Sequence, residues 1–258
     1  MCGIVGIIHP SSTSAEDILG EMLARITHRG PDDSGTFIDQ KVAFGMRRLS
    51  IIDVEGGKQP ISSEDGSLII VFNGEIYNFK ELRAELVLGG HTFKTHTDTE
   101  VILHLYEEKG EDAVRALRGM FTFFIYDIKK GKVVVARDPF GIKPLYYMMK
   151  DGMVRAIGSE IKSLLALPQY KKEINEEAIF QYLSFQYNPL RETFFKGIYR
   201  LPPATYLIID VKTGHAEEKK YWSFSFHAND TMDEERAAKE LAGILMDSVE
   251  HHLISDVP

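Results

Sequence analysis

The chain has 258 residues, of which 44% are hydrophobic and 26% charged, and 30 basic against 38 acidic side chains give a formal net charge of −8. This is an ordinary globular composition. The sequence has no run of lysine or arginine that would bind a phosphate backbone, so a nucleic-acid partner is not expected. No apolar run is long enough to span a bilayer. A secretory signal has a basic region ahead of its apolar segment, and the short apolar N-terminus here has none. We therefore expect a cytoplasmic protein with no membrane partner.

The N-terminus carries the first candidate for chemistry. Cys2 is the only cysteine, so the chain forms no internal disulfide. Removal of Met1 would leave Cys2 with a free α-amine of pKa about 7.7–8.0 beside a thiol of about 8.5, and one residue would then supply both nucleophile and base. The β-branched run 4–8 predicts a buried strand that fixes this terminus. A lone cysteine is more often a small buried hydrophobic residue, and both interpretations stay open here.

The first half of the chain mixes helical and strand patterns. Apolar spacing predicts a helix over 14–29, which Gly30-Pro31 ends. Thr97 and Glu100 form a capping-box pattern that predicts the start of another helix. Further patterns predict strands at 36–39, 42–49 and 68–72, and a helix from Phe79 to Gly89.

The second half is richer in strands. Strands are predicted at 120–127, 132–137, 144–149 and 153–158, helices at 160–167 and 175–184, and a last strand pair at 204–211 and 219–222. Several strands are apolar on both faces, which indicates that each side of a sheet is covered. We therefore expect sheets that pack together under helical layers.

The C-terminal segment differs from the rest. Residues 233–252 predict a charged helix with one apolar face, formed by Leu241, Ile244, Leu245 and Val249. Such a face needs a partner surface. We expect residues 212–258 to be a linker and the first helix of a second domain.

Three polar groups could serve a reaction at Cys2. Asn73-Gly74 follows an apolar strand and offers a side-chain amide beside a backbone N–H, the donor pair that an oxyanion needs, although Asn-Gly is equally typical of a hairpin turn. Arg47-Arg48 lies near a strand end, where alternation directs one side chain inward and the other to solvent; an inward guanidinium could bind a substrate carboxylate, although a solvent-exposed arginine is the commoner outcome. Asp98, in the first turn of its helix, could bind an ammonium group or simply favour the helix dipole.

The histidines could suggest a metal site. His91, His96 and His104 lie close in the sequence. Their spacing matches no common metal motif, and no second cysteine is available. No metal and no cofactor are therefore expected in this chain.

Six ordered motifs together resemble a known family. They are Cys2–Gly6, Arg29–Gly35, Arg48–Asp53, Phe72–Asn78, Thr97–Glu100 and Ala136–Leu145. The set resembles the glutamine amidotransferases with an N-terminal cysteine nucleophile, and specifically the glutaminase domain of glutamine-hydrolysing asparagine synthetases. The resemblance covers residues 2–211, and the second and third motifs favour the synthetase branch over the sugar-phosphate and phosphoribosyl branches.

The resemblance implies a fold and a site. The fold is the α+β, four-layer αββα sandwich of two antiparallel sheets found in N-terminal nucleophile hydrolases. Cys2 is then the catalytic nucleophile, and Asn73 with Gly74 forms the oxyanion hole. L-Glutamine is bound by Arg48, Leu49, Ser50, Ile51, Ile52, Asn73, Gly74, Glu75 and Asp98.

The resemblance also implies which of two domains performs each reaction. Residues 1–211 would form the glutaminase domain, which releases ammonia from glutamine for ATP-dependent asparagine synthesis by a following synthetase domain. ATP and Mg²⁺ would bind only in that following domain, and a homodimer is possible. Two alternatives stay open: an amidotransferase that supplies ammonia to another acceptor, and a non-catalytic domain for glutamine sensing or packing.

Overall fold

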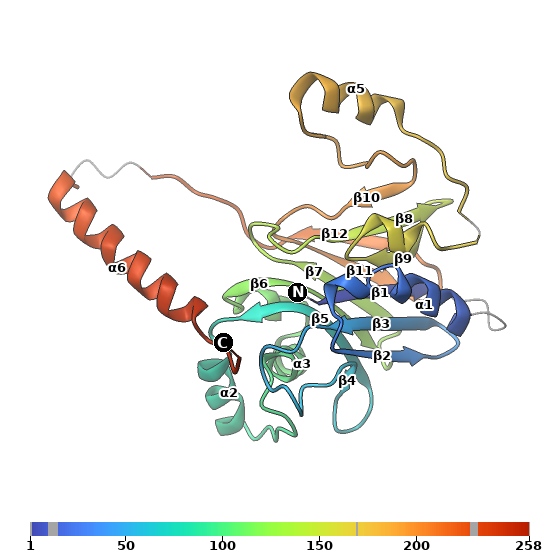
Figure 1. The fold of residues 1–258 in the computed structure, drawn as a ribbon. Helices are drawn as coiled ribbons and strands as arrows, with labels where there is room; N and C mark the ends of the chain where they lie inside the picture. The colour runs from blue at the N-terminus through green and yellow to red at the C-terminus, as the bar shows by residue number, and fades with distance from the viewer. Residues whose placement is uncertain (1, 10–14, 169, 228–231, 258) are drawn as a thin grey trace.

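A computed structural model describes residues 2–9, 15–168, 170–227 and 232–257. The central part of the protein consists of two six-stranded sheets, in which all neighbouring strands run antiparallel (Figure 1). The first sheet has the order β10 (Ile198–Arg200), β8 (Tyr146–Lys150), β9 (Met153–Gly158), β1 (Gly3–Ile8), β3 (Val42–Arg48) and β2 (Asp33–Ile38). The second has the order β12 (Ala216–Lys220), β11 (Thr205–Asp210), β7 (Lys132–Arg137), β6 (Gly119–Asp127), β5 (Leu68–Ile76) and β4 (Ile61–Ser62).

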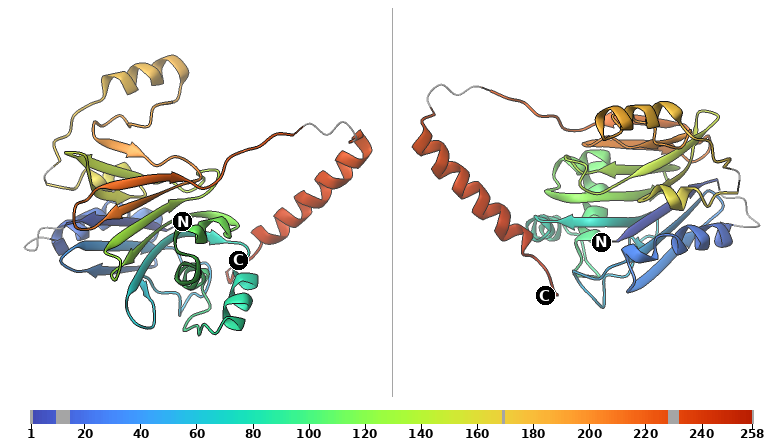
Figure 2. Two further views of the ribbon diagram at one scale, coloured as in Figure 1. Left: turned by 180° about the vertical axis from the view of Figure 1, so that it is seen from behind. Right: turned by 45° about the horizontal axis from the view of Figure 1, so that its top comes forward.

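Helices cover the outer face of each sheet (Figure 2). On the first sheet lie α1 (Ala15–Ala24) and α4 (Ile161–Leu164), and on the second lie α2 (Phe79–Leu88) and α3 (Asp98–Lys109). One apolar cluster fills the space between the sheets, and two more fill the spaces between each sheet and its helices. The four-layer αββα sandwich of the α+β class is therefore confirmed.

Strand β6 shows why its sequence is apolar on both faces. Phe124 and Tyr126 belong to the cluster between the sheets, whereas Phe121, Phe123 and Ile125 belong to the cluster under α2 and α3. Successive side chains of a strand point to opposite faces, so both sets are buried. The prediction of a layer on each side of this sheet is confirmed.

One helix prediction and one of the alternatives considered for Asn73-Gly74 differ from the structure. The helix predicted over 14–29 ends at Ala24, and a 3₁₀ turn follows at Thr27–Arg29; its first predicted residue, 14, lies outside the described residues. The hydroxyl of Thr27 donates to the carbonyls of Leu23 and Ala24 at 3.4 and 3.0 Å, which offers these groups an alternative to further helix. The hairpin turn considered at Asn73-Gly74 does not form, because β5 continues to Ile76 and pairs with β6 throughout.

Two helices lie at the edges of the sandwich (Figure 1). Helix α5 (Glu176–Phe185) stands on an arm beside β10, whereas the C-terminal end of α6 (Glu234–His252) contacts the sandwich: Asp247 pairs with Arg118, and the ring of His252 lies 4.3 Å from that of Tyr77. The predicted apolar face of α6 is exposed: Leu241, Ile244, Leu245 and Val249 each keep at least 56% of their accessible surface. Among the described residues, no helix is long and apolar enough to cross a membrane.

Candidate active site

Cys2 lies at the start of β1 and opens into a pocket where the two sheets meet. The carbonyl of Cys2 accepts a 2.9 Å hydrogen bond from Nε of Arg29, and its Sγ accepts one of 3.4 Å from the N–H of Leu49. Burial raises the pKa of the thiol, and the Leu49 contact opposes that rise. The resting sulfur is therefore a thiol that needs a base before it can attack. Met1, whose removal would free the Cys2 amine, lies outside the described residues.

Asn73 faces the same pocket with unused hydrogen-bonding capacity. Its side chain is 1% exposed, and neither Oδ1 nor Nδ2 has a hydrogen-bond partner within the described part of the chain. An unpartnered buried amide costs about 1–3 kcal/mol, so such groups are rare without a functional reason. At Gly74, a Cβ would lie 2.2 Å from the carbonyl oxygen of Met120 on β6, so only glycine fits. The pair thus presents hydrogen-bond donors from a buried position.

Arg48 lies at the end of β3 and organises the loop that forms one pocket wall. Its guanidinium donates to the carbonyls of Ile52, Asp53 and Val54 at 3.0, 2.7 and 2.9 Å. Arginine has five N–H donors, so three are engaged with the loop. The side chain is 4% exposed and lines the pocket. Arg48 is therefore buried, and the solvent-exposed interpretation was wrong.

Two carboxylates also line the pocket. Asp98 begins α3, whose predicted N-cap Thr97 accepts a 3.2 Å bond from the N–H of Thr99, whereas Glu100 accepts from the N–H groups of Lys94 and Thr95 and not from that of Thr97 as a capping box requires. The carboxylate of Asp98 accepts from the N–H of Ile76 at 3.0 Å, and burial raises its pKa to about 6. Burial also raises the pKa of Glu75. Both groups would be stabilised by a cation in the pocket.

The pocket gathers nearly all of the predicted site residues. Its lining includes Cys2, Arg48, Leu49, Ile51, Ile52, Asn73, Gly74, Glu75 and Asp98. Ser50 is not among the lining residues, and its N–H donates instead to Asp32 at 2.9 Å. Segments that are far apart in the sequence therefore meet at one place.

Other lining residues received no role from the sequence. They are Gly57, Gln59, Phe72, Thr97, Thr99 and Lys143. Lys143 is 2% exposed, and burial lowers its pKa while the nearby Glu75 opposes that change. Asp138 positions it by accepting from the N–H groups of Phe140, Ile142 and Lys143. The available signal was the motif Ala136–Leu145, which includes this turn.

Comparisons with known proteins agree with the geometry. A family model for the glutamine amidotransferase domain matches residues 1–222. The chain is 45% identical over 262 residues to the glutamine-hydrolysing asparagine synthetase 1 of Bacillus subtilis, covering all of this chain and 41% of that protein. It is 41% identical over 278 residues to synthetase 2 of the same organism, covering all of this chain and 36% of that protein. The chain thus spans about two-fifths of the length of these relatives.

A solved structure extends the likeness to the fold. Glutamine phosphoribosylpyrophosphate amidotransferase from Bacillus subtilis matches with a TM-score of 0.61 and 22% identity, over 88% of this chain and 50% of that one. At this identity the likeness concerns the fold alone. With the family match over residues 1–222 and the pocket built by its motifs, the chain belongs to the glutamine amidotransferase domain family.

Proposed function

We propose that this chain hydrolyses L-glutamine to glutamate and ammonia through a thioester on Cys2. One observation carries the proposal: Cys2, which has the only thiol of the chain, lines the same pocket as Asn73, whose buried amide has no partner among the described residues. A nucleophile and an oxyanion donor that face one pocket are what acyl transfer requires.

The reaction proceeds in two balanced steps. The Cys2 α-amine, freed by removal of Met1, takes the thiol proton, and Sγ attacks the side-chain amide carbon of glutamine. Nδ2 of Asn73 and the N–H of Gly74 stabilise the resulting oxyanion. The carbon–nitrogen bond breaks, the proton goes to the leaving nitrogen, and ammonia departs. Water then attacks the thioester carbon, and the carbon–sulfur bond breaks to give glutamate and the thiol.

Charges at the pocket walls select the free amino acid. Arg48, supported by the loop 49–52, attracts the α-carboxylate, and Asp98 with Glu75 attracts the α-ammonium group. Arg48, Asp98 and Glu75 all line the pocket. Losing a buried charge-assisted contact costs on the order of 2–5 kcal/mol, so a substrate that lacks either charge should bind poorly.

The raised pKa of Asp98 predicts a pH dependence of glutamine binding. Below about pH 6 the carboxylate is protonated and no longer attracts the ammonium group. We expect the Kd of a Cys2→Ala protein for glutamine to be flat above this pH and to rise by up to about tenfold per unit below it. Isothermal titration calorimetry measures this in the absence of turnover.

The matched control is Asp98→Asn in the same background, which should bind glutamine weakly and without this pH dependence. N-Acetylglutamine, which has no ammonium group, should bind weakly at every pH. Binding of N-acetylglutamine as tight as that of glutamine would contradict this assignment of Asp98.

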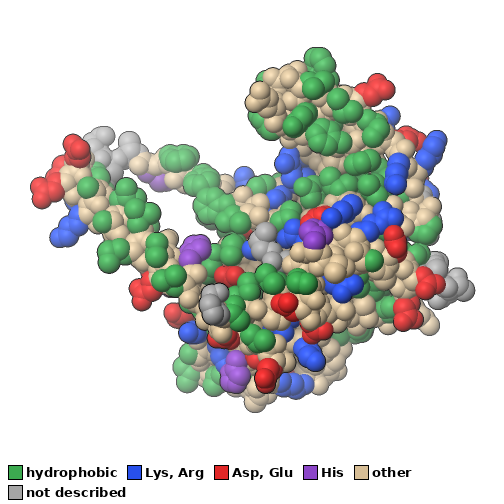
Figure 3. Space-filling model, in the orientation of Figure 1, with side chains coloured by type: hydrophobic (Ala, Val, Ile, Leu, Met, Phe, Trp, Pro, Cys, Tyr) green, Lys and Arg blue, Asp and Glu red, His purple; other side chains and the backbone are tan. Residues whose placement is uncertain are grey.

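We also propose the domain division: a glutaminase domain over residues 1–211, and a segment 212–258 that comprises a linker and the first helix of a synthetase domain. Strand β12, in the linker, pairs with β11 of the glutaminase domain. Figure 3 shows apolar side chains gathered along both α5 and α6, including exposed Phe180 and Leu183 on the former. These surfaces favour a further domain as their cover. That domain would bind ATP and Mg²⁺ and use the ammonia to make asparagine from aspartate; a cytoplasmic location and a homodimer complete the proposal.

If the synthetase chemistry lies outside this chain, glutamine hydrolysis here should ignore the synthetase substrates. We expect the purified chain to release glutamate at the same rate with or without ATP, Mg²⁺ and aspartate, because the described pocket has no phosphate-binding glycine loop. Coupled assays for glutamate, asparagine and AMP test this. Asparagine formed by the purified chain would contradict the domain division, and a chain that releases no glutamate after verified removal of Met1 would contradict the proposed hydrolysis.

A further inference from the structure

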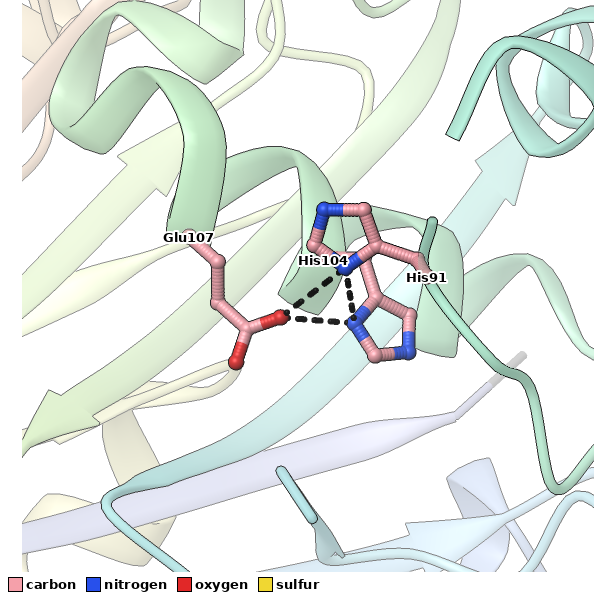
Figure 4. Close-up of side chains that lie close together, drawn as sticks. All are labelled: His91, His104 and Glu107. Atoms are coloured by element: carbon pink, nitrogen blue, oxygen red, sulfur yellow. Dashed lines mark hydrogen bonds and ion pairs between the residues drawn. The ribbon is translucent and has the colours of Figure 1, made fainter. Parts of the chain in front are cut away.

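A second group of side chains lies outside the glutamine pocket. His91, on the segment between α2 and α3, meets His104 and Glu107 of α3 (Figure 4). Nδ1 of His91 and Nδ1 of His104 are 3.2 Å apart, and Oε2 of Glu107 is 3.5 and 2.7 Å from them. Three potential metal-binding atoms thus converge on one point.

The triangle has the size of one face of a tetrahedral metal site. Zinc lies about 2.0–2.2 Å from nitrogen and carboxylate oxygen ligands, which places two ligands of a tetrahedron about 3.3–3.6 Å apart. The His91–His104 and His91–Glu107 separations of 3.2 and 3.5 Å lie close to this range, whereas the 2.7 Å separation of His104 and Glu107 is that of a direct hydrogen bond. A single proton can form a hydrogen bond in only some of these three contacts, whereas a metal ion at the centre would bind all three atoms.

The surroundings supply one outer contact of such a site. Metal-bound imidazoles usually direct their other ring nitrogen toward a carboxylate. Nε2 of His91 lies 2.8 Å from Oε1 of Glu108, whereas Nε2 of His104 lies 3.8 Å from carboxylate oxygens of Glu64 and Glu100, beyond hydrogen-bond distance. Within the described residues, this buried Nε2 of His104 has no hydrogen-bond partner. The carboxylates around two imidazoles also favour a divalent cation electrostatically.

We propose that His91, His104 and Glu107 bind a divalent transition metal, with zinc as the ion that suits two imidazoles and one carboxylate. The side chains of His91 and Glu107 are 16% and 25% exposed, so an ion can enter and a water can take the fourth position. The metal ties the segment before α3 to the helix that carries Asp98. This site replaces the expectation of no metal, because residues too irregularly spaced for a sequence motif are brought together by the packing of α3.

Zinc binding can be measured directly on the Cys2→Ala protein without a purification tag, so that the thiol does not compete. We expect one equivalent of Zn²⁺ to bind from zinc sulfate against a chromophoric chelator, and to raise the Tm. Co²⁺ in its place should give the strong visible absorption of a tetrahedral site. His91→Asn or Glu107→Gln should weaken zinc binding by more than about 100-fold, beyond what loss of an outer contact does.

The matched control is His96→Asn, which removes an exposed histidine of the same segment that lies outside the cluster. It should bind zinc as the parent protein does. The proposal is overturned if the parent binds zinc no more tightly than His91→Asn and Glu107→Gln, or if His96→Asn loses as much affinity as they do. Circular dichroism of all four proteins separates lost binding from lost folding.

Discussion

Replacing Cys2 with alanine is expected to abolish glutamine hydrolysis and leave glutamine binding intact. Cys2 immediately precedes β1 with its sulfur against Leu49, and no other thiol exists in the chain to take its place. Removing the nucleophile of a hydrolase lowers kcat on the order of 10⁶-fold. Charges supplied by Arg48 and Asp98 are unchanged, so calorimetry should give a glutamine affinity close to that of the parent protein.

Covalent labelling checks the same assignment independently. An electrophilic glutamine analogue should add once per chain, and intact mass should place one adduct on the parent and none on Cys2→Ala. The same spectrum shows whether Met1 has been removed. Cys2→Ser is the closest match in shape and should retain the fold and glutamine binding with very low turnover. An adduct on Cys2→Ala would contradict the role of Cys2.

Replacing Asn73 with alanine is expected to lower kcat by about 10²–10³-fold, or about 2.7–4 kcal/mol, with little change in KM. In the proposed mechanism the Asn73 amide donates its hydrogen bond to the substrate oxygen when negative charge develops there. Removing the amide should therefore destabilise the transition state more than the bound substrate. Because the buried amide has no partner at rest, its removal should not lower the Tm. Steady-state kinetics and a thermal melt together test both statements.

Thr122→Val provides the matched control for Asn73. Thr122 is the cross-strand neighbour of Asn73 on β6, and its buried hydroxyl also has no partner within the described chain. The substitution removes one polar atom beside Asn73 and keeps the volume of the side chain. Its kcat should change by less than about tenfold. An equal loss in both variants would assign the effect to strand packing, and an unchanged kcat in Asn73→Ala would remove Asn73 from the mechanism.

Local signals predicted much of this architecture. Thr97 caps α3 as its sequence indicates, and the alternation along β6 matches burial on two faces. These features depend on neighbours within a few residues, so a single sequence contains them. The six motifs likewise identified nearly every residue of the pocket wall that received a proposed role.

Long-range packing produced the features that the sequence did not predict. Asn-Gly favours a turn locally, yet pairing with β6 keeps Asn73 and Gly74 extended. β4 and β10 span two and three residues, too few to show a period. The inward position of Lys143 depends on a turn around Asp138, and the contact of His91 with α3 depends on tertiary structure. None of these is encoded in residue spacing.

The anchoring of Cys2 has a practical consequence for recombinant expression. Its carbonyl is held by Arg29 and the next residue already belongs to β1, so the start of the chain is built into the sandwich. Any polypeptide fused ahead of Cys2 would convert its amine to an amide, which cannot accept a proton. An affinity tag therefore belongs at the C-terminal end. Under the proposed mechanism, protein that keeps Met1 lacks the base, so active-site titration, rather than total protein, gives the concentration of active enzyme.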